Sequence, residues 1–311
     1  MGYLAVDIGA TNLRVASGDD RRLNSKISES TDRKNGPYGI SDQIVRLAGE
    51  LSISELRAVG IGSIGPIDLA SGRIVDTPNL PFKDIPIVNP LQEAFSVPVA
   101  MLNDCSAAVL GEQRFGAGKG VRNLVYITLS TGIGGGALVD GHLLRGKDGN
   151  AVEIGHLTID PQSRLRCGCG CMGHWEAYAS GSGIPNFVSE NLEPGDADSL
   201  MLELAGGDPG GITAEILFEA AERGDSTAIR LVRMLGEVNA IGLADVVNLF
   251  DPEMVTIGGS IALNHPRLIL EPIQENIDRH LINREPEIII TPLGEDAVLY
   301  GALAHATSLM E

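Results

Sequence analysis

Residues Leu4 to Ala16 are the part of this chain whose residue types are best suited to bind a ligand. Two apolar runs flank a polar turn, a pattern that predicts two strands joined by that turn. Gly9 lets the backbone approach a bound anion, and the amides that follow it, together with the Thr11 hydroxyl, can donate to phosphate oxygens. Asp7 can hold a water molecule of a hydrated Mg²⁺ ion. The turn is therefore a candidate nucleotide phosphate site, and an ordinary hairpin with a solvated aspartate is the alternative.

A second segment, Leu124 to Asp140, repeats this plan. An apolar run up to Leu129 predicts a strand, and two hydroxyl residues and four glycines follow before the chain becomes apolar again. This glycine turn lacks the GK[ST] ending of a P-loop and does not lead into a helix as a dinucleotide-binding fingerprint would. Two similar turns in one chain predict a duplicated architecture of strand, turn and strand.

Asp104 is the residue that we expect to carry the reaction. A predicted strand ends at Leu102 and a predicted helix begins at about Cys105. Asn103 and Asp104 thus lie between a strand end and a helix start, where α/β sheets bind ligands and where the helix dipole favours an ionised carboxylate. An ionised aspartate can accept a hydroxyl proton there, and the alternative is that Asp104 only caps the helix.

Further polar side chains have the chemistry that a polyol substrate requires. Sugar hydroxyls need acceptors and donors in fixed directions, which amides, carboxylates and imidazole provide. Asn79 lies in a loop bracketed by prolines. Glu153, His156 and Glu176 lie in two polar, glycine-containing motifs, AVEIGHLTID and HWEAYASG. Each of these residues alone is more often a surface or capping residue, so the interpretation depends on their occurring together.

A cluster of cysteines and histidines follows in the sequence CGCGCMGHWE. Cysteines two residues apart point to opposite sides of an extended chain and do not readily form a disulfide with each other. Metal binding is the better interpretation, because zinc takes four Cys or His ligands. The spacing is not that of a common zinc finger. We expect a structural zinc site made of His156, Cys167, Cys169 and His174.

The composition excludes some classes of protein. The chain of 311 residues has a formal net charge of −18, so it lacks the excess of Lys and Arg that neutralises a nucleic-acid backbone. With 43% hydrophobic residues it is long enough for two domains with cores of their own. No apolar run is long enough to cross a membrane and no apolar leader occurs, so we expect a cytoplasmic protein without a membrane partner.

Strand and helix patterns alternate along the chain, as they do in α/β proteins. Short apolar runs predict further strands at Ala58 to Ile61 and Met254 to Ile257, and the apolar spacing between Thr213 and Asn248 predicts two amphipathic helices. The glycine-rich stretch FGAGKG is the expected boundary between two domains. We place the first domain at residues 1–118, completed by a C-terminal helix at about 295–311, and the second domain, with the cysteine cluster, at residues 119–294.

Together these motifs make the chain resemble the ROK family of sugar kinases within the actin-like ATPase superfamily. The matching pieces cover almost the whole chain in the family's order: DIGATN, GIGSIGPID, TPNLP, LNDCSAAVLGE, LSTGIGGG, EIGH, CGCGCMGHWE and LGEDAVLYGAL. The resemblance implies an α/β fold of two duplicated actin-like (ribonuclease H-like) domains with a cleft between them. It also implies a homodimer, ATP and a small-molecule sugar as substrates, Mg²⁺, and a structural Zn²⁺ ion.

The resemblance assigns a role to each motif. It implies that Asp104 is the general base of an ATP-dependent transfer to the 6-hydroxyl of glucose, as in the glucokinases and hexokinases of the family. The residues that it assigns to the sugar are Gly65, Asn79, Asn103, Asp104, Glu153, His156 and Glu176. Those that it assigns to the nucleotide are Asp7, Gly9, Thr11, Asn12, Thr131, Gly132, Gly258 and Gly259.

One motif departs from the family pattern. The family's CxCGxxGCxE supplies three cysteines to zinc, whereas this chain has His174 at the third position and an additional Cys171. Histidine also ligates zinc, so the change bears on the affinity of the site for zinc and on its occupancy.

Three alternatives stay open at this point. Kinases for N-acetylhexosamines, mannose or fructose share most of these residues. A sugar-sensing transcriptional regulator of the family would need a DNA-binding helix-turn-helix before the first turn, which begins at Asp7. A non-catalytic actin-like ATPase would keep both turns but would have no use for the polar residues expected around Asp104.

Overall fold

The computed structural model describes residues 2–53, 55–77, 79–162 and 165–311. The chain divides into two compact units. Unit 1 comprises residues 1–126, 136–152 and 291–311, and unit 2 comprises residues 127–135 and 153–290. Among the described residues, no helix combines the length and the apolar composition that a membrane span requires.

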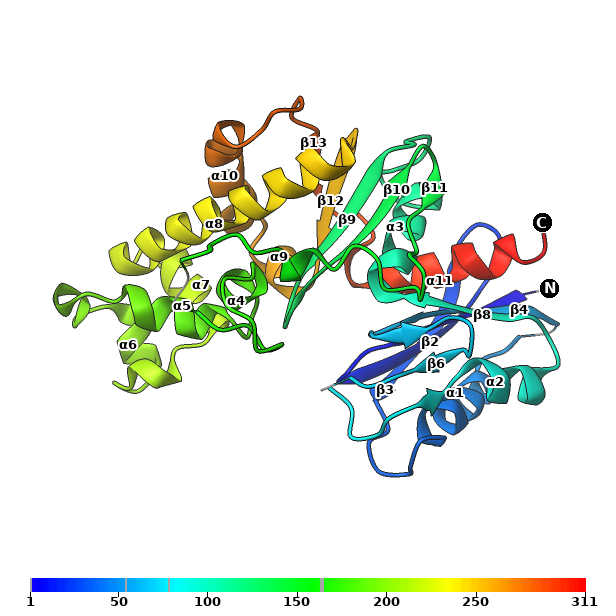
Figure 1. Ribbon diagram of the computed structural model, residues 1–311. Coiled ribbons are helices and arrows are strands. Elements are labelled where there is room, and N and C mark those ends of the chain that lie inside the picture. The colour runs from blue at the N-terminus through cyan, green and yellow to red at the C-terminus, as the bar shows by residue number, and fades with distance from the viewer. Residues whose placement is uncertain (1, 54, 78, 163–164) are drawn as a thin grey trace. The chain divides into compact units, whose positions relative to one another are not determined.

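Unit 1 is built on a five-stranded sheet whose central strand leads into the first polar turn (Figure 1). β1 (Gly2–Ile8) pairs antiparallel with β2 (Asn12–Gly18) and parallel with β4 (Leu56–Ser63). β3 (Leu23–Ser30) continues the sheet beyond β2, and β8 (Val99–Asn103) continues it beyond β4. The strand order is therefore β3-β2-β1-β4-β8.

This sheet has two apolar faces, and helices cover both of them (Figure 1). Val6 of β1 packs in a core with residues of α1 (Gly39–Glu50) and α2 (Val88–Phe95). Its neighbour Ala5 packs in a second core with residues of α11 (Ala297–Ser308). Side chains alternate between the faces of a strand, so β1, which is apolar up to Asp7, supports both layers of helices.

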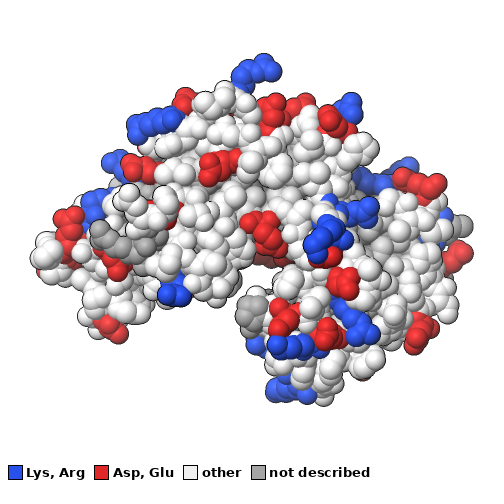
Figure 2. Space-filling view, in the orientation of Figure 1, with Lys and Arg blue, Asp and Glu red and all other residues white. Residues whose placement is uncertain are grey.

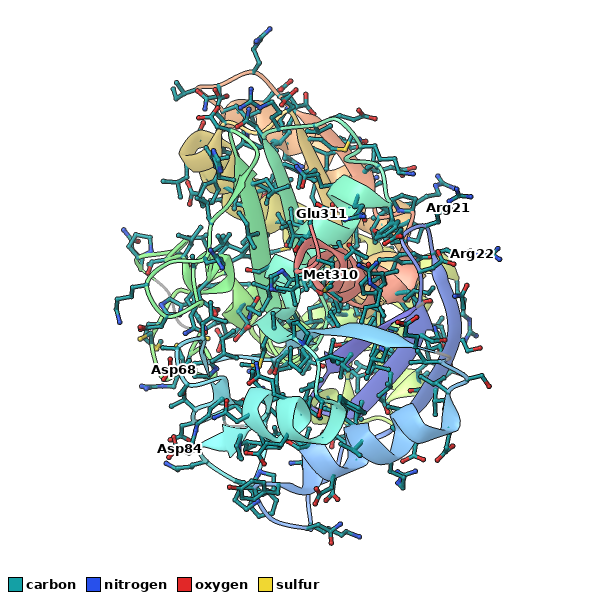
Figure 3. All side chains as sticks on the ribbon, turned by 90° about the vertical axis from the view of Figure 1, so that its right-hand side faces the viewer. Arg21, Arg22, Asp68, Asp84, Met310 and Glu311 are labelled. Carbon is teal, nitrogen blue, oxygen red and sulfur yellow. The ribbon has the colours of Figure 1, made fainter. Side chains whose placement is uncertain are left out.

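Glycines bring α11 into backbone contact with its neighbours. A Cβ atom on Gly60 of β4 would collide with the carbonyl oxygen of Ala302 in α11. A Cβ atom on Gly301 of α11 would collide with the carbonyl oxygen of Ala107 in α3 (Asp104–Arg114). α11, which Figure 3 shows end-on, therefore packs tightly on both β4 and α3 and supports the helix that begins at the expected catalytic residue.

The second sheet repeats the order of the first. Its strands lie in the order β11-β10-β9-β12-β13, so in both sheets the first strand of the set is central, with the second and third on one side and the fourth and fifth on the other. These strands are β9 (Leu124–Leu129), β10 (Ile133–Val139), β11 (His142–Leu143), β12 (Met254–Gly258) and β13 (Glu287–Ile290). The repeated order is the duplication that the two polar turns predict.

Unit 2 is mainly helical outside this sheet. The side chains of Thr213 and Asp225 cap the N-termini of α7 (Ala214–Glu222) and the long α8 (Ser226–Phe250). The other helices of the unit are α4 (Glu176–Ala179), α5 (Ile184–Asn191), α6 (Leu200–Leu204), α9 (Ser260–Asn264) and α10 (Pro266–Asn276).

Short elements complete both units. β5 (Ile67–Asp68), β6 (Arg73–Ile74) and β7 (Ile85–Pro86) form a small antiparallel sheet in unit 1. The loop between β6 and β7 carries Asn79. Turns of 3₁₀ helix lie at Ile154–His156, Pro194–Asp196, Pro209–Gly211, Ile277–Arg279 and Gly294–Asp296.

The structure confirms the predicted strands and helices with one difference. Both strands of each turn, the strand and helix on either side of Asp104, and the two amphipathic helices all occur. The glycine pattern places residues 134–136 in the second turn, whereas β10 already begins at Ile133. A Cβ atom on Gly136 would collide with the carbonyl oxygen of Cys105, so glycine serves close packing within a strand here and not a turn.

The division into units differs in detail from the expected domains. Residues 136–152 belong to unit 1, whereas the expected second domain contains them. Compactness alone does not establish which segments fold independently. Domains at residues 1–118 with 295–311 and at residues 119–294 therefore stay a prediction.

Candidate active site and metal centre

The first polar turn is held by hydrogen bonds within unit 1. The Gly9 amide donates to the Asn12 carbonyl oxygen at 3.0 Å, and a Cβ atom on Gly9 would lie 2.8 Å from the same oxygen. Thr31 donates through its hydroxyl to the Gly9 carbonyl oxygen at 2.7 Å and through its amide to the Thr11 carbonyl oxygen at 2.9 Å. Thr11 and Asn12 are exposed, so the closed turn presents them to a ligand.

Asp7, at the end of β1, is buried and forms an ion pair with Arg14 of β2. The two residues are direct partners in the antiparallel strand pair. Arg14 donates to Asp7 Oδ2 through Nε at 2.8 Å and also through Nη2. Burial raises the pKa of the Asp7 carboxyl, and the Arg14 guanidinium lowers it. Arg14 belongs to none of the sequence motifs, although its place opposite Asp7 follows from the register of the hairpin.

Asp104 lies at the junction of β8 and α3. The Asn103 side chain caps the helix, because its Oδ1 accepts from the amides of Cys105 at 3.0 Å and Ser106 at 3.4 Å. Asp104 Oδ1 accepts from the Cys105 amide at 2.8 Å. Asn103 is buried and Asp104 is half-buried. The Asp104 carboxylate is therefore held at the positive end of the helix dipole, which favours its ionised form.

Gly65 lies in the loop after β4, beside Asn103. A Cβ atom on Gly65 would lie 3.5 Å from Asn103 Nδ2 and equally far from Asn150 Oδ1. Asn150 accepts from the Ile67 amide at 2.8 Å and donates to the Ile67 carbonyl oxygen at 2.7 Å. Asn150 thus holds the Gly65 loop near the start of α3, a contribution that no sequence motif indicated. Asn79 is exposed in the loop between β6 and β7.

The second polar turn, Ser130–Gly132, is held by the segment that follows α4 in unit 2. The Gly181 amide donates to the Ser130 carbonyl oxygen at 2.7 Å. Ser182 donates to the Thr131 carbonyl oxygen through its amide at 3.2 Å and its hydroxyl at 2.9 Å. Thr131 is exposed, so this turn also presents a hydroxyl residue to a ligand.

Gly258 is the last residue of β12, and Gly259 follows it and lies against the strand before this turn. Gly259 has a φ of +87°, and a Cβ atom on it would collide with the Leu129 carbonyl oxygen. The hydroxyl oxygen of the next residue, Ser260, lies 3.1 Å from that of Ser130. The glycine pair therefore brings the start of α9 onto the second turn.

A pocket of about 320 Å³ opens beside the second turn, within unit 2. Phe218 and His265 line it with stacked rings whose centroids are 4.7 Å apart, and His265 Nδ1 lies 2.7 Å from Glu222 Oε1. The polar residues of the lining are Ser130, Thr131, Ser182, Thr213, Glu215, Ser260 and Asn264. Aromatic side chains with a few polar groups are the usual lining of a site for a small organic ligand.

Four residues that were expected to bind zinc come together in unit 2, and we call them the Cys/His knuckle: His156, Cys167, Cys169 and His174. One donor atom from each lies within 4.8 Å of all the others. Cys167 Sγ is 3.8 Å from His156 Nδ1, and Cys169 Sγ is 3.3 Å from His174 Nδ1. A tetrahedral zinc ion holds sulfur and nitrogen donors about 3.5 Å apart. The donor atoms and their spacing therefore fit one zinc ion.

The knuckle residues differ in how readily they reach the form that ligates a metal. Burial raises the pKa of the Cys167 thiol to about 12, whereas a hydrogen bond from the Cys171 backbone lowers the pKa of Cys169. Burial and the nearby His156 lower the pKa of His174, which favours the neutral imidazole that binds metals. Cys171 is exposed and lies outside the set of four donors.

Glu176, the first residue of α4, contacts both the knuckle and the second turn. Its Oε2 accepts from the Ile133 amide at 3.0 Å, and its Oε1 lies 3.4 Å from Cys167 Sγ. Glu153 is a close neighbour: desolvation and the charge of Glu176 raise the pKa of the Glu153 carboxyl, and His156 opposes that rise. Two carboxyl groups and an imidazole are thus gathered beside the second turn.

The predicted residues form one set on each unit. Unit 1 carries Asp7, Gly9, Thr11, Asn12, Gly65, Asn79, Asn103 and Asp104. Unit 2 carries Thr131, Gly132, Glu153, His156, Cys167, Cys169, His174, Glu176, Gly258 and Gly259. Each unit therefore has its own polar turn together with residues that the family resemblance assigns to the sugar.

The charged side chains are mixed on the face that Figure 2 shows. Lys and Arg are interspersed with Asp and Glu there, and large areas carry neither. This face therefore presents no continuous basic stripe to a polyanionic backbone, in keeping with the formal net charge of −18.

The duplicated sheets and their polar turns define a two-domain α/β protein of the actin-like class. A model of the ROK family matches residues 3–308, and the chain belongs to this family. It is 38% identical to the glucokinase of Pyrobaculum calidifontis over an alignment of 304 residues. The alignment covers 98% of this chain and 94% of that protein. The family and the fold predicted from the motifs are therefore confirmed.

Two solved structures support the same assignment. The ROK family glucokinase from Streptomyces griseus, in complex with glucose and AMPPNP, matches 99% of this chain and 100% of that one, with 34% identity and a TM-score of 0.82. The ROK hexokinase from Thermus thermophilus matches 100% of this chain and 99% of that one, with 34% identity and a TM-score of 0.84.

Proposed function

We propose that this chain is an ATP-dependent glucokinase that transfers the γ-phosphoryl group to the 6-hydroxyl of glucose. The observation that carries the proposal is the position of Asp104, held by the Cys105 amide at the junction of β8 and α3. The similarity to a glucokinase that contains glucose and AMPPNP supports the two substrates.

Asp104 is the general base. Its carboxylate accepts the proton of the sugar hydroxyl while that oxygen attacks the γ-phosphorus in line and ADP leaves. Phosphoryl transfer passes through a loose transition state, so most of the acceleration comes from positioning and from compensating charge. The cap of Asn103 on α3 and the support from α11 provide this positioning for the base.

Each unit carries one polar turn that suits the binding of a phosphate group. The amides that follow Gly9 and the hydroxyl of Thr131 donate to phosphate oxygens. Asp7 would hold a hydrated Mg²⁺ ion, which would supply positive charge to the transferring group. Arg14 keeps Asp7 ionised and oriented through two hydrogen bonds to Oδ2.

The pocket beside the second turn receives the adenosine. The stacked rings of Phe218 and His265 supply its aromatic wall, and hydroxyl groups on its rim suit the ribose. Gly258 and Gly259 come directly before Ser260, which lines the pocket, and Gly259 brings the start of α9 against the second turn.

The resemblance assigns to the sugar the amides of Asn79 and Asn103 on unit 1, and the carboxylates and imidazole of Glu153, Glu176 and His156 on unit 2. Gly65 leaves room for the sugar, because it carries no side chain beside Asn103. His156 directs Nδ1 toward Cys167 and so has Nε2 for a hydroxyl. A zinc ion on the knuckle, when bound, fixes the orientation of this imidazole.

A coupled ADP-release assay over a panel of sugars tests the proposal. Glucose should give the highest kcat/KM among glucose, mannose, fructose, N-acetylglucosamine and N-acetylmannosamine. A preference for another sugar would change the assigned substrate but would still support a sugar kinase activity. An absence of sugar-dependent ADP release with every member of the panel would reject the proposed function.

The family resemblance also supports a homodimer that acts in the cytoplasm, and we propose both. Multi-angle light scattering of the purified chain distinguishes a dimer from a monomer by its mass. Fractionation of cells tests the location.

A further inference from the structure

We propose that Glu222 is a positioning residue for recognition of the nucleotide base. It holds His265 with a proton on Nδ1 and leaves Nε2 as an acceptor that selects a base with a 6-amino group. The inference deepens the proposed function and rests on it, because it takes the pocket beside the second turn as the adenosine site. It concerns residues of unit 2 alone.

Two side chains of α7 hold the ring of His265. Phe218 and Glu222 are four residues apart on this helix, so their side chains lie on the same face. The Phe218 ring stacks on the imidazole with 4.7 Å between centroids and 15° between planes. Glu222 Oε1 lies 2.7 Å from His265 Nδ1. The first contact fixes the plane of the imidazole, and the second fixes its rotation within that plane.

The backbone of His265 is fixed as well. Its amide donates to the Ile261 carbonyl oxygen of α9 at 3.0 Å, and its carbonyl oxygen accepts from the Ile269 amide of α10 at 3.1 Å. His265 is half-buried, whereas Phe218 is only 1% exposed. Of the two stacked rings, His265 is therefore the one that a bound base meets.

Glu222 determines which nitrogen of His265 carries the proton. A carboxylate can only accept a hydrogen bond, so Nδ1 is the donor of this pair. In a neutral imidazole the other nitrogen, Nε2, then has a free lone pair. No residue that the structure describes bonds to Nε2. Glu222 lies outside the pocket lining and His265 belongs to it, so Nε2 is the ring nitrogen that is left for a ligand.

The position of His265 along α9 suits contact with a base. The helix begins at Ser260, whose hydroxyl oxygen lies 3.1 Å from that of Ser130 in the second turn. Because α9 has five residues, His265 follows about 7.5 Å further along, at 1.5 Å per residue. A nucleotide with its phosphates at the turn extends its base toward this end of the pocket.

An acceptor at this place distinguishes purines by their 6-substituent. Adenine has a 6-amino donor, whereas guanine and hypoxanthine have a 6-oxo acceptor. The amino group can donate to Nε2, but the oxo group sets its lone pairs against that of Nε2. Two other polar residues of the lining, Glu215 and Asn264, are exposed, so water competes for them more than for the half-buried His265. Nε2 therefore makes the largest contribution to the choice of base.

Calorimetry with ADP and with inosine diphosphate tests the proposal, in the presence of Mg²⁺, without sugar and at about pH 8, where an imidazole is neutral. The two ligands differ only in the 6-substituent and the proton on N1. The wild-type protein should bind ADP at least about fivefold more tightly, which corresponds to one hydrogen bond. Glu222→Ala should reduce this preference to less than about twofold, although Glu222 is not part of the pocket lining.

His265→Phe keeps a ring against Phe218 and removes the acceptor, so it should still bind nucleotide but without the preference. Two-bond nitrogen–proton NMR correlation supplies a readout that a merely structural role would not move. In the wild type the ring proton of His265 should be on Nδ1, and in Glu222→Ala it should no longer be confined to Nδ1. The signals missing in His265→Phe assign this residue among the six histidines of the chain.

The matched control is Glu219→Ala. It removes another exposed carboxylate of α7, one that pairs with Arg223 at 3.0 Å and not with His265. It should keep both the wild-type preference for ADP and the proton on Nδ1. Far-UV circular dichroism checks that each variant stays folded.

Four results would overturn the proposal. They are a wild-type protein that does not bind ADP, one that binds inosine diphosphate as tightly as ADP, a wild-type His265 with its proton on Nε2, and a Glu222→Ala variant with the full preference. Because the experiment contains no sugar and needs no turnover, its failure is separate from failure of the glucokinase proposal, which the ADP-release assay decides.

Discussion

Asp7 and Arg14 face each other across the β1–β2 hairpin, and both hydrogen bonds that Arg14 donates to Asp7 go to one oxygen, Oδ2. Arg14 also donates through Nη1 to the Glu295 carbonyl oxygen at 2.6 Å, which anchors it to the segment before α11. Oδ1 is not used by Arg14 and can accept from a water of Mg²⁺. Arg14 therefore both compensates the charge of the buried carboxylate and orients it.

Arg14→Gln should lower kcat/KM for MgATP by about tenfold or more, because hydrogen bonds to a charged group contribute about 1.5 to 3 kcal/mol. It should also move the acid limb of the pH profile to higher pH. Burial raises the pKa of Asp7 and Arg14 lowers it, so without Arg14 a smaller fraction of Asp7 is ionised at a given acidic pH. Steady-state kinetics from pH 5 to 8 measures both effects.

Arg21→Gln is the matched control, since Arg21 lies exposed at the turn between β2 and β3 (Figure 3). It should leave the profile of the wild type unchanged. An Arg14→Gln enzyme with an unshifted acid limb would show that Arg14 does not set the ionisation of Asp7.

This pair shows that some of the site was open to prediction. A four-residue turn joins Ile8 to Leu13, so these two residues are partners across the hairpin. The next pair away from the turn is then Asp7 with Arg14. An arginine opposite a strand-end aspartate is therefore a feature that the sequence alone contains. The turn itself was predictable because glycine and polar residues interrupt two apolar strands.

Asp104→Asn should reduce turnover by roughly 100-fold or more while glucose still binds, because the amide keeps the shape of the carboxylate and loses the proton acceptor. Calorimetry with glucose and a coupled ADP assay give the two quantities. Glu93→Gln, on the exposed side of α2, serves as the control. Near wild-type turnover in Asp104→Asn would remove the base assignment.

The purified chain should contain about one zinc ion, held by the Cys/His knuckle. Cys167→Ser should lose the metal, and it should also weaken glucose binding because His156 belongs to both the zinc set and the sugar set. Cys171→Ser is the sharper control, since Cys171 is a neighbouring cysteine outside the set of four. Metal analysis by mass spectrometry decides the outcome, and a metal-free protein with full activity would show that packing alone holds the knuckle.

Other parts of the site could not be predicted from the sequence. Glu176 supports the amide of Ile133, 43 residues earlier in the chain, and Asn150 brackets Ile67, 83 residues earlier. Such contacts depend on how loops pack in three dimensions, and no periodicity in a single sequence encodes them. The knuckle was predictable because metal ligation requires rare residue types close together.

Folding stability should fall as the pH decreases from about 6.5 to about 4 because of His305 in α11. Burial lowers the pKa of His305 to about 4, and the nearby Arg145 contributes to the lowering. An unfolded histidine has a pKa of about 6.5, so between these values the unfolded chain binds a proton that the folded chain does not. The loss from this one group is of the order of 3 kcal/mol across the window.

His305→Gln should flatten this part of the pH dependence, whatever its effect on stability at pH 7. Chemical denaturation at several pH values between 4 and 7 measures the slope. His142→Gln, at an exposed position on β11, should keep the slope of the wild type. An unchanged slope in His305→Gln would show that His305 does not cause the acid destabilisation.

The product of the reaction tests the central claim most directly. The chain is incubated with glucose, ATP and Mg²⁺, and phosphorus and carbon NMR identify the phosphorylated hydroxyl, with Asp104→Asn as the negative control. The account predicts one product, glucose phosphorylated on the 6-hydroxyl, formed in equal amount to ADP. Phosphate on another hydroxyl, or ADP formed together with free phosphate and no sugar phosphate, would contradict it.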